Sequence, residues 1–348
     1  MEDTATPTET RTRAYNLLLD RQQDVARGIF ACTGERDHDA ENLRVHIRYL
    51  CEAVRLGEAS LFADYVHWAK VRHAAASRLR VFGKELWCLR DSVLATMEPE
   101  VNAVVVPVLD AALGQFRGMP LETCSHLDPR TDFGRLADSY LRCLLGGNRA
   151  SARELIFAAL DRGMDARDIY LQVFQQSQIE VGRLWQTNQI SVAQEHFCTA
   201  ATLQIMTLVF GRVAASVQRN GRRMVATCVG GDLHEVGIRI VSDFFELNGW
   251  DTYYLGADTP VADVVNAVCM NRAHVLAISA TMTYHLAAVE KLILALRREP
   301  RCQSVRILVG GYPFNATPDL WRKVGADGFA ADARQALDVA GSFTLSQA

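Results

Sequence analysis

The 348 residues lack three features, each of which is typical of a large class of proteins: a membrane-spanning run, a secretory signal and an excess of positive charge. No apolar run approaches the roughly 20 residues that cross a bilayer, and the polar start MEDTATPTETRTR is no secretory signal. Positive charge is not in excess, since 37 Lys and Arg against 40 Asp and Glu give a net charge of −3. We therefore expect neither membrane association nor direct binding to nucleic acid.

Closely spaced cysteine pairs are also missing. The nine cysteines are scattered and none forms a C-x-x-C pair (residues 32, 51, 88, 124, 143, 198, 228, 269 and 302). This spacing argues against a cysteine zinc site and predicts reduced thiols in a cytoplasmic protein.

The N-terminal third has the periodicity of helices. After Pro99, apolar residues recur three and four positions apart on one face (Val101, Val104, Val105, Val108, Leu109, Ala112 and Phe116). We expect an all-α, globin-like domain over 13–117, preceded by a flexible tail, 1–12. Two prolines and a loss of periodicity predict a linker over 118–133.

The remaining chain changes period once. Residues 134–219 are helical and are interrupted by glycines at 146, 147 and 163, which predicts a four-helix bundle. From Met224 short apolar runs alternate with helical segments (MVATCV, TYYLG, VLAISATM, VRILVGG and GFAA). This alternation predicts a five-stranded parallel, Rossmann-like (flavodoxin-like) α/β domain over 222–345.

Three short motifs follow expected strands of this sheet. The segment GGDLHEVG places His234 after the first strand, Ser279–Thr281 ends the third strand, and Gly310–Gly311 ends the fourth. Such strand ends meet at one edge, where ligands of parallel sheets bind. A histidine hydrogen-bonded to Asp232 has a fixed tautomer and one nitrogen free for a metal. An isolated Asp-x-His is more often a capping Asp and a surface His, but the small residues at the other strand ends favour the metal ligand.

These motifs together resemble the cobalamin (vitamin B12)-binding module, with its Asp-x-His-x-x-Gly, Ser-x-Thr and Gly-Gly. The resemblance implies that His234 is the lower axial ligand of cobalt and displaces the nucleotide base of the cofactor. The displaced base would enter a slot lined by small residues (Gly237, Ser279, Thr281, Gly310 and Gly311).

The preceding helical block, VGRLWQTNQISVAQEHF, resembles the four-helix cap of the CarH-type B12-dependent photoreceptors. The resemblance implies that Trp185, Glu195 and His196 surround the upper, adenosyl face of the corrin, and Val192 would line the same pocket. The chain departs from that family at position 186. It has Gln186 there, whereas CarH-type proteins have a histidine that captures cobalt after photolysis.

In layout, the N-terminal helical domain resembles that of the photocobilins, which implies biliverdin as a second chromophore. A slot for biliverdin needs aromatic walls and cationic partners for two propionates. The candidates are Trp68, Arg72, His73 and Arg80. The alternative is a helical dimerisation or partner-docking domain.

We therefore expect a light sensor and not an enzyme. Adenosylcobalamin would bind between cap and sheet domain, and photolysis would change the cap, the assembly of a homo-oligomer, or the state of an unidentified output partner. Two alternatives stay open: a corrinoid carrier of a methyltransferase system, and a light-independent cobalamin-responsive regulator. If Trp185→Ala or Glu195→Ala weakens adenosylcobalamin binding more than methylcobalamin binding, the light sensor is favoured; equal losses favour the carrier.

Overall fold

The computed structural model describes residues 6–34 and 40–345. The chain divides into two compact units, Met1–Thr123 and Cys124–Ala348, each of which is described here by itself. Within the described ranges, no helix combines the length and the apolar character that crossing a membrane requires.

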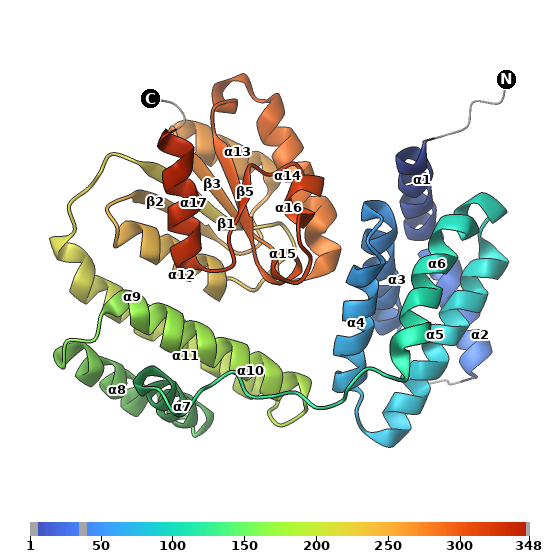
Figure 1. The fold of residues 1–348 in the computed structure, drawn as a ribbon, viewed down its shortest axis with the longest axis horizontal. Coiled ribbons are helices and arrows are strands. Elements are labelled where there is room, and N and C mark those ends of the chain that lie inside the picture. Colours follow the sequence, from blue (N-terminus) through green and yellow to red (C-terminus); the bar gives the residue numbers. More distant parts are fainter. Residues whose placement is uncertain (1–5, 35–39, 346–348) are drawn as a thin grey trace. The chain divides into compact units, whose positions relative to one another are not determined.

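The N-terminal unit is helical throughout its described part (Figure 1). Its core is made of side chains from every helix, among them Leu18, Ile29, Leu50, Val66 and Leu89, all fully or almost fully buried. The predicted helical N-terminal region is thus confirmed. The helices are α1 (Pro7–Asp20), α2 (Gln22–Thr33), α3 (Ala40–Leu56), α4 (Ala59–Arg72), α5 (Ala76–Thr96) and α6 (Pro99–Phe116).

The start of α1 corrects the expected tail over 1–12. Helix α1 begins at Pro7, so the expectation is wrong for residues 7–12, while residues 1–5 lie outside the described part. Thr6 accepts a hydrogen bond from the Glu9 N–H, and the Glu9 carboxylate accepts one from the Thr6 N–H at 2.8 Å. This capping box, with Pro7 in the first turn, is a helix-start signal that polar composition concealed.

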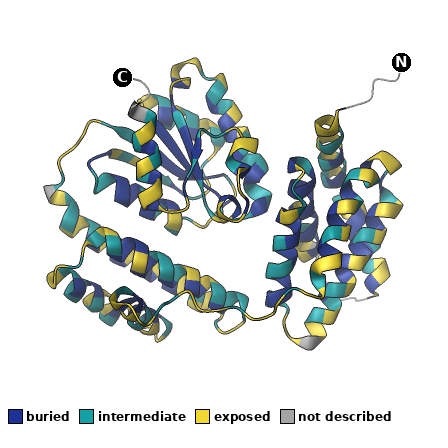
Figure 2. Ribbon diagram, viewed as in Figure 1, coloured by how far each residue is buried: buried dark blue, intermediate teal, exposed yellow. Residues whose placement is uncertain are grey.

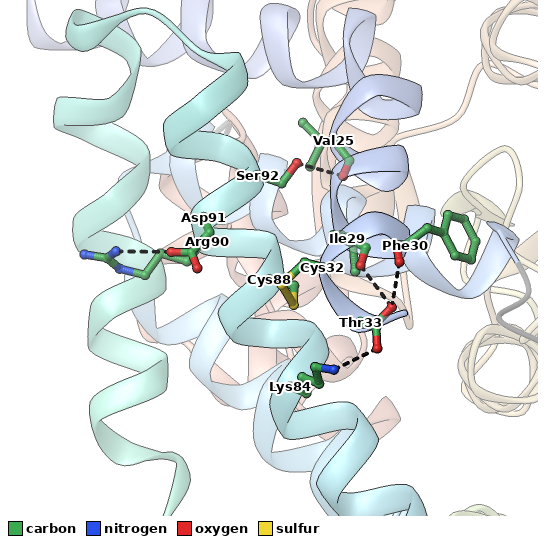
Figure 3. The surroundings of a disulfide bond; sticks show 10 residues. All are labelled: Val25, Ile29, Phe30, Cys32, Thr33, Lys84, Cys88, Arg90, Asp91 and Ser92. Carbon is green, nitrogen blue, oxygen red and sulfur yellow. Dashed lines mark hydrogen bonds and ion pairs between the residues drawn. A yellow bond between two sulfur atoms is a disulfide. The ribbon is translucent and has the colours of Figure 1, made fainter. Parts of the chain in front are cut away.

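Two disulfides correct the expectation that all cysteines are reduced. Cys32 on α2 and Cys88 on α5 are joined, with their Cα atoms 5.7 Å apart (Figure 3). Cys269 and Cys302 are joined as well, with a Cα separation of 6.0 Å. The absence of a C-x-x-C pair excludes only local pairing. Helix packing brings together cysteines that are 56 and 33 residues apart in sequence.

A helical cap opens the C-terminal unit, as predicted. It has four helices within the described residues: α7 (Asp132–Leu145), α8 (Arg149–Asp161), a third formed without interruption by α9 (Ala166–Ile169), the π-helical η1 (Tyr170–Gln175) and α10 (Gln176–Gln186), and α11 (Val192–Val213). Tyr140, Tyr170 and Phe174 are completely buried in its core. A 3₁₀ turn, η2 (Ala214–Ser216), ends the cap.

The predicted parallel sheet follows, with strand order β2-β1-β3-β4-β5. Its central strands β1 and β3 are buried along almost their whole length (Figure 2). The five-stranded Rossmann-like fold is therefore confirmed. The strands are β1 (Arg223–Cys228), β2 (Asp251–Gly256), β3 (Val275–Ser279), β4 (Arg306–Gly310) and β5 (Gly328–Phe329); the helices are α12 (Val236–Glu246), α13 (Val261–Met270), η3 (Thr283–His285), α14 (Leu286–Arg298), η4 (Pro300–Cys302), α15 (Tyr312–Ala316), α16 (Leu320–Lys323) and α17 (Ala333–Leu345).

The cap and the sheet domain share one hydrophobic core at one end. Ile240 and Phe244 of α12 and Ala333 of α17 are buried in the same cluster as the core residues of the cap. An exposed ion pair, Arg334 Nη2 to Asp168 Oδ1 at 2.6 Å, joins α17 to α9. This end of the cap is therefore fixed to the sheet domain by buried apolar surface.

Candidate functional site

The three strand-end motifs lie together because the strands are parallel and in register. Cys228 of β1 pairs with Ser279 of β3, and Ser279 pairs with Gly310 of β4. The loops that begin with Val229, Ala280 and Gly311 therefore leave the same edge of the sheet. This edge is where a parallel sheet binds its ligands.

Asp232 is the buried centre of this edge. Its side chain is fully enclosed, and Oδ1 accepts hydrogen bonds from the His234 N–H at 3.0 Å and from His234 Nδ1 at 2.7 Å. Oδ2 accepts the N–H of Thr281 at 2.6 Å. Burial acts to raise the pKa of Asp232, but these hydrogen bonds outweigh it and hold the pKa well below its usual range. Asp232 is thus a permanent anion that ties the loop after β1 to the loop after β3.

His234 faces outward from this anchor. Its side chain is 57% exposed, and Nε2 makes no hydrogen bond to the described residues. The hydrogen bond to Asp232 raises the pKa of His234 against the opposing effect of burial, and the charges of Asp232 and Glu195 raise it further. With Nδ1 held by a carboxylate, Nε2 is the atom that can donate its lone pair to a metal.

His285 is a member of this cluster that sequence reasoning missed. It ends η3, and its buried Nδ1 lies 3.5 Å from Asp232 Oδ2, where it helps to lower the pKa of that carboxyl. The ring packs beside Gly231, where a Cβ would come within 3.4 Å of Nε2. Its position six residues after Ser279 was the available signal, because a parallel sheet returns that loop to the edge occupied by Asp232.

The glycines at this edge allow the backbone of two loops to approach closely. Gly311 has a φ of +104°, and a Cβ there would lie 2.1 Å from the carbonyl oxygen of Ala280. Only glycine fits this position. At Gly237 a Cβ would meet nothing within 4 Å, so the start of α12 borders open space. Gly311 therefore closes the loops after β3 and β4 together, and Gly237 leaves room beside the first turn of α12.

The predicted cap residues lie on either side of the turn that joins α10 to α11; they are Trp185, Val192, Glu195 and His196. Trp185 is at the end of α10, and α11 begins at Val192 with a capping box between Ser191 and Gln194. Glu195 accepts a hydrogen bond from Thr199 at 2.9 Å and lies 2.6 Å from His196 Nδ1. Because the Glu195 charge acts on His234, this end of the cap lies within electrostatic range of the sheet edge.

The four residues expected around biliverdin line neither of two cavities in the described part of the N-terminal unit, one beside α1 and one beside α4. The cavity beside α4 has a volume of about 380 Å³ and lies between α4 and α6, lined by Ala59, Ser60, Ala63, Asp64, His67, Ala111, Gln115 and Met119. Trp68 and Arg72 belong to α4, His73 stacks on Phe82 at 5.2 Å, and Arg80 is exposed on α5. Biliverdin binding stays a prediction.

The donor set at the sheet edge fits a metal that brings most of its own ligands. Among the described residues, no three His, Cys, Asp or Glu side chains converge to hold a bare ion. A single oriented imidazole with an open nitrogen, on an edge where Gly237 borders open space, instead suits a corrin, which supplies the equatorial donors of its cobalt.

Comparison with known proteins agrees with this class of site. Two family models, each described as a B12 binding domain, match residues 136–209 and residues 222–339. The C-terminal unit is therefore a pair of B12-binding domains, a helical cap followed by a Rossmann-like domain. Neither model extends over residues 1–135.

Two curated relatives are corrinoid proteins of Methanosarcina species. Dimethylamine corrinoid protein 3 of Methanosarcina acetivorans is 28% identical over 158 residues, which cover 45% of this chain and 73% of that protein. Dimethylamine corrinoid protein 2 of Methanosarcina mazei is 26% identical over 206 residues, 58% of this chain and 92% of that protein. The solved monomethylamine corrinoid protein of Methanosarcina barkeri is 25% identical, with a TM-score of 0.52 over 59% of this chain and 97% of that one.

These relatives overturn the expected photoreceptor. Their names point to corrinoid proteins connected with methylamines, which agrees with the alternative of a corrinoid carrier. The error came from Trp185 and the Glu195-His196 pair. A flat apolar side chain and a carboxylate near the upper face of a corrin are compatible with several upper ligands, so this spacing does not distinguish an adenosyl group from a methyl group.

Proposed function

We propose that this protein is a corrinoid carrier of a methyl-transfer system and not itself an enzyme. In this proposal it holds cobalamin between the helical cap and the sheet domain and presents the bound methyl group to a separate methyltransferase. The names of the relatives support it, as does a likeness that covers 97% of the monomethylamine corrinoid protein. The observation that carries it is the open Nε2 of His234, held in place by the buried Asp232.

Each residue of the sheet edge has a role in this proposal. His234 Nε2 is the lower axial ligand, and Asp232 keeps the proton on Nδ1 so that Nε2 stays a lone-pair donor. The slot for the displaced nucleotide base runs along small residues, which are Gly237, Ser279, Thr281, Gly310 and Gly311. Cobalamin, when bound, supplies a metal that takes up a methyl group and gives it away.

The cap residues cover the upper face in the same proposal. Trp185 and Val192 provide an apolar lid that keeps water from the methyl group. Glu195 and His196 are paired with each other at 2.6 Å and stand at the rim of that lid. A methyl group needs only a small space between the lid and the corrin, so an adenosyl group is not required to explain these residues.

The N-terminal unit fits this function as a docking or dimerisation domain, the alternative already set beside biliverdin binding. A carrier has to meet two partners in turn, one that donates the methyl group and one that accepts it. Biliverdin has no role in such a cycle. The cytoplasmic location stays a prediction.

The proposal is tested by methyl transfer in the dark. The full chain is loaded with hydroxocobalamin, reduced, and mixed with dimethylamine and a methyltransferase that uses it. We expect the absorption spectrum of protein-bound methylcobalamin to appear, and to be absent without the methyltransferase. The proposal is overturned if methylcobalamin fails to bind while adenosylcobalamin binds and illumination changes the mass of the assembly on size-exclusion chromatography.

A further inference from the structure

A continuous chain of polar contacts runs from the residue beside His234 to the core of the cap. Glu235 Oε2 accepts a hydrogen bond from the Tyr254 hydroxyl at 2.8 Å. The guanidinium of Arg239 lies over the Tyr254 ring, 5.3 Å from its centroid. Arg239 Nε donates to Asp243 Oδ1 at 2.8 Å, and the Tyr170 hydroxyl donates to Asp243 Oδ2 at 2.9 Å. This series of contacts thus crosses from the sheet domain to the cap.

The cap end of this chain is deeply buried. Tyr170 is completely enclosed, and the Asp243 side chain is 5% exposed. The Tyr170 hydroxyl also lies 3.1 Å from the carbonyl oxygen of Met206, so it contacts α11 as well. Tyr170 opens η1, a π-helical turn, and such wide turns reposition side chains and are frequent at functional sites.

Arg239 is the central member of this series, and its side chain contacts both Tyr254 and Asp243. It uses its Nε for the carboxylate and its flat face for the aromatic ring, a combination that lysine cannot provide. Its side chain is 24% exposed, and its backbone N–H donates to the carbonyl oxygen of Glu235 at 2.9 Å. Arg239 is therefore linked to Glu235 through the backbone and through Tyr254.

We propose that Arg239 is a positioning residue that couples the placement of the His234 imidazole to the placement of the cap. Because Glu235 follows His234 directly, a shift of the imidazole toward or away from a metal moves the carboxylate that holds Tyr254. Arg239 transmits the shift to Asp243 and Tyr170 at the fixed end of the cap. The other end, with Trp185 and Glu195, then responds to the state of the lower ligand. This inference rests on the proposed function, since it assigns the coupling to a cobalamin carrier.

The test measures how bound cob(II)alamin divides between His-ligated and unligated forms, by electron paramagnetic resonance of the full chain. Tyr170→Phe and Tyr254→Phe each remove one hydroxyl group, on opposite sides of Arg239 in this series of contacts. Neither hydroxyl belongs to a proposed ligand of the metal. We expect each to shift the ratio toward the unligated form by about threefold or more. The double variant should shift it by less than the product of the two, and in an Arg239→Met background the two effects should simply multiply.

Arg334→Met is the matched control. It removes the exposed contact between Asp168 and α17 and leaves the chain from Glu235 to Tyr170 intact. We expect its ratio to equal that of the wild type. The inference is overturned if Tyr254→Phe and Arg239→Met leave the ratio unchanged, or if Arg334→Met shifts it as much as they do. A wild-type protein without any His-ligated signal would instead overturn the proposed function.

Discussion

The Nδ1 atom of His234 lies 2.7 Å from Oδ1 of Asp232, so an exposed imidazole is anchored to a fully buried carboxylate. The anion is in turn held by the backbone N–H of Thr281, 49 residues away in sequence. A surface histidine seldom has such support. Burying the charge of Asp232 is unfavourable, and this burial is explained if Nε2 of His234 binds a metal.

The cap should not distinguish strongly between upper ligands. Under the carrier proposal, Trp185→Ala and Glu195→Ala weaken the binding of methylcobalamin and adenosylcobalamin by similar factors, because both residues lie beside the corrin and neither is specific for an adenosyl group. A loss of roughly tenfold for Glu195→Ala corresponds to one hydrogen bond to a charged acceptor. Titration calorimetry with both cofactors in the dark measures this. A loss confined to adenosylcobalamin would contradict it.

His285 should steady the anchor of the cobalt ligand. His285→Leu removes the only side chain, besides His234, that lies within ion-pair distance of Asp232 in the described part of the chain. The reduced support for the carboxylate should lower the His-ligated fraction of bound cobalamin. His285→Asn, whose amide can place a donor near the former Nδ1, should restore most of it. Absorption spectra of the two variants provide the comparison, and equal spectra would mean that Asp232 does not need this group.

Stability should depend on the protonation of Asp243. Burial raises the pKa of Asp243 to about 6 from an ordinary value of 3.8, against the opposing effects of Arg239 and Tyr170. The folded state therefore binds more protons than the unfolded state between about pH 4 and pH 6. The free energy of unfolding should fall as the pH rises through this interval, by on the order of 3 kcal/mol from this group.

Asp243→Asn should remove that contribution. Urea unfolding of the wild type and the variant at several values between pH 4 and pH 7 gives the difference between their free energies of unfolding. We expect this difference to change in favour of the variant as the pH rises. A difference that is independent of pH would show that Asp243 titrates normally.

Much of the fold was predictable because its signals are local. The five strands of the sheet are short apolar runs between helical segments, and the observed strands match the runs from MVATCV to GFAA within a few residues. The edge motifs could be grouped because parallel strands put their carboxyl ends together. Neither inference required knowledge of side-chain contacts.

The remaining features depend on contacts between residues that are distant in sequence. The link between Cys32 and Cys88 requires the packing of α2 against α5, where Ser92 Oγ also bonds to the carbonyl oxygen of Val25 at 2.9 Å (Figure 3). His285 becomes part of the site only through the return of β3 to β1. The start of α1 at Pro7 is different, because its capping box of Thr6 and Glu9 is a local signal.

The central claim is that a protein imidazole, His234 Nε2, is the lower ligand of cobalt, and isotope labelling tests it directly. The full chain is produced with ¹⁵N, loaded with unlabelled cobalamin and reduced to the cob(II) state for electron paramagnetic resonance. We predict that each cobalt line is split in two by one ¹⁵N nucleus, and that His234→Ala loses this splitting while its melting curve shows an intact fold. A three-line splitting that labelling leaves unchanged would mean that the nucleotide base of the cofactor still binds cobalt, and would contradict the account.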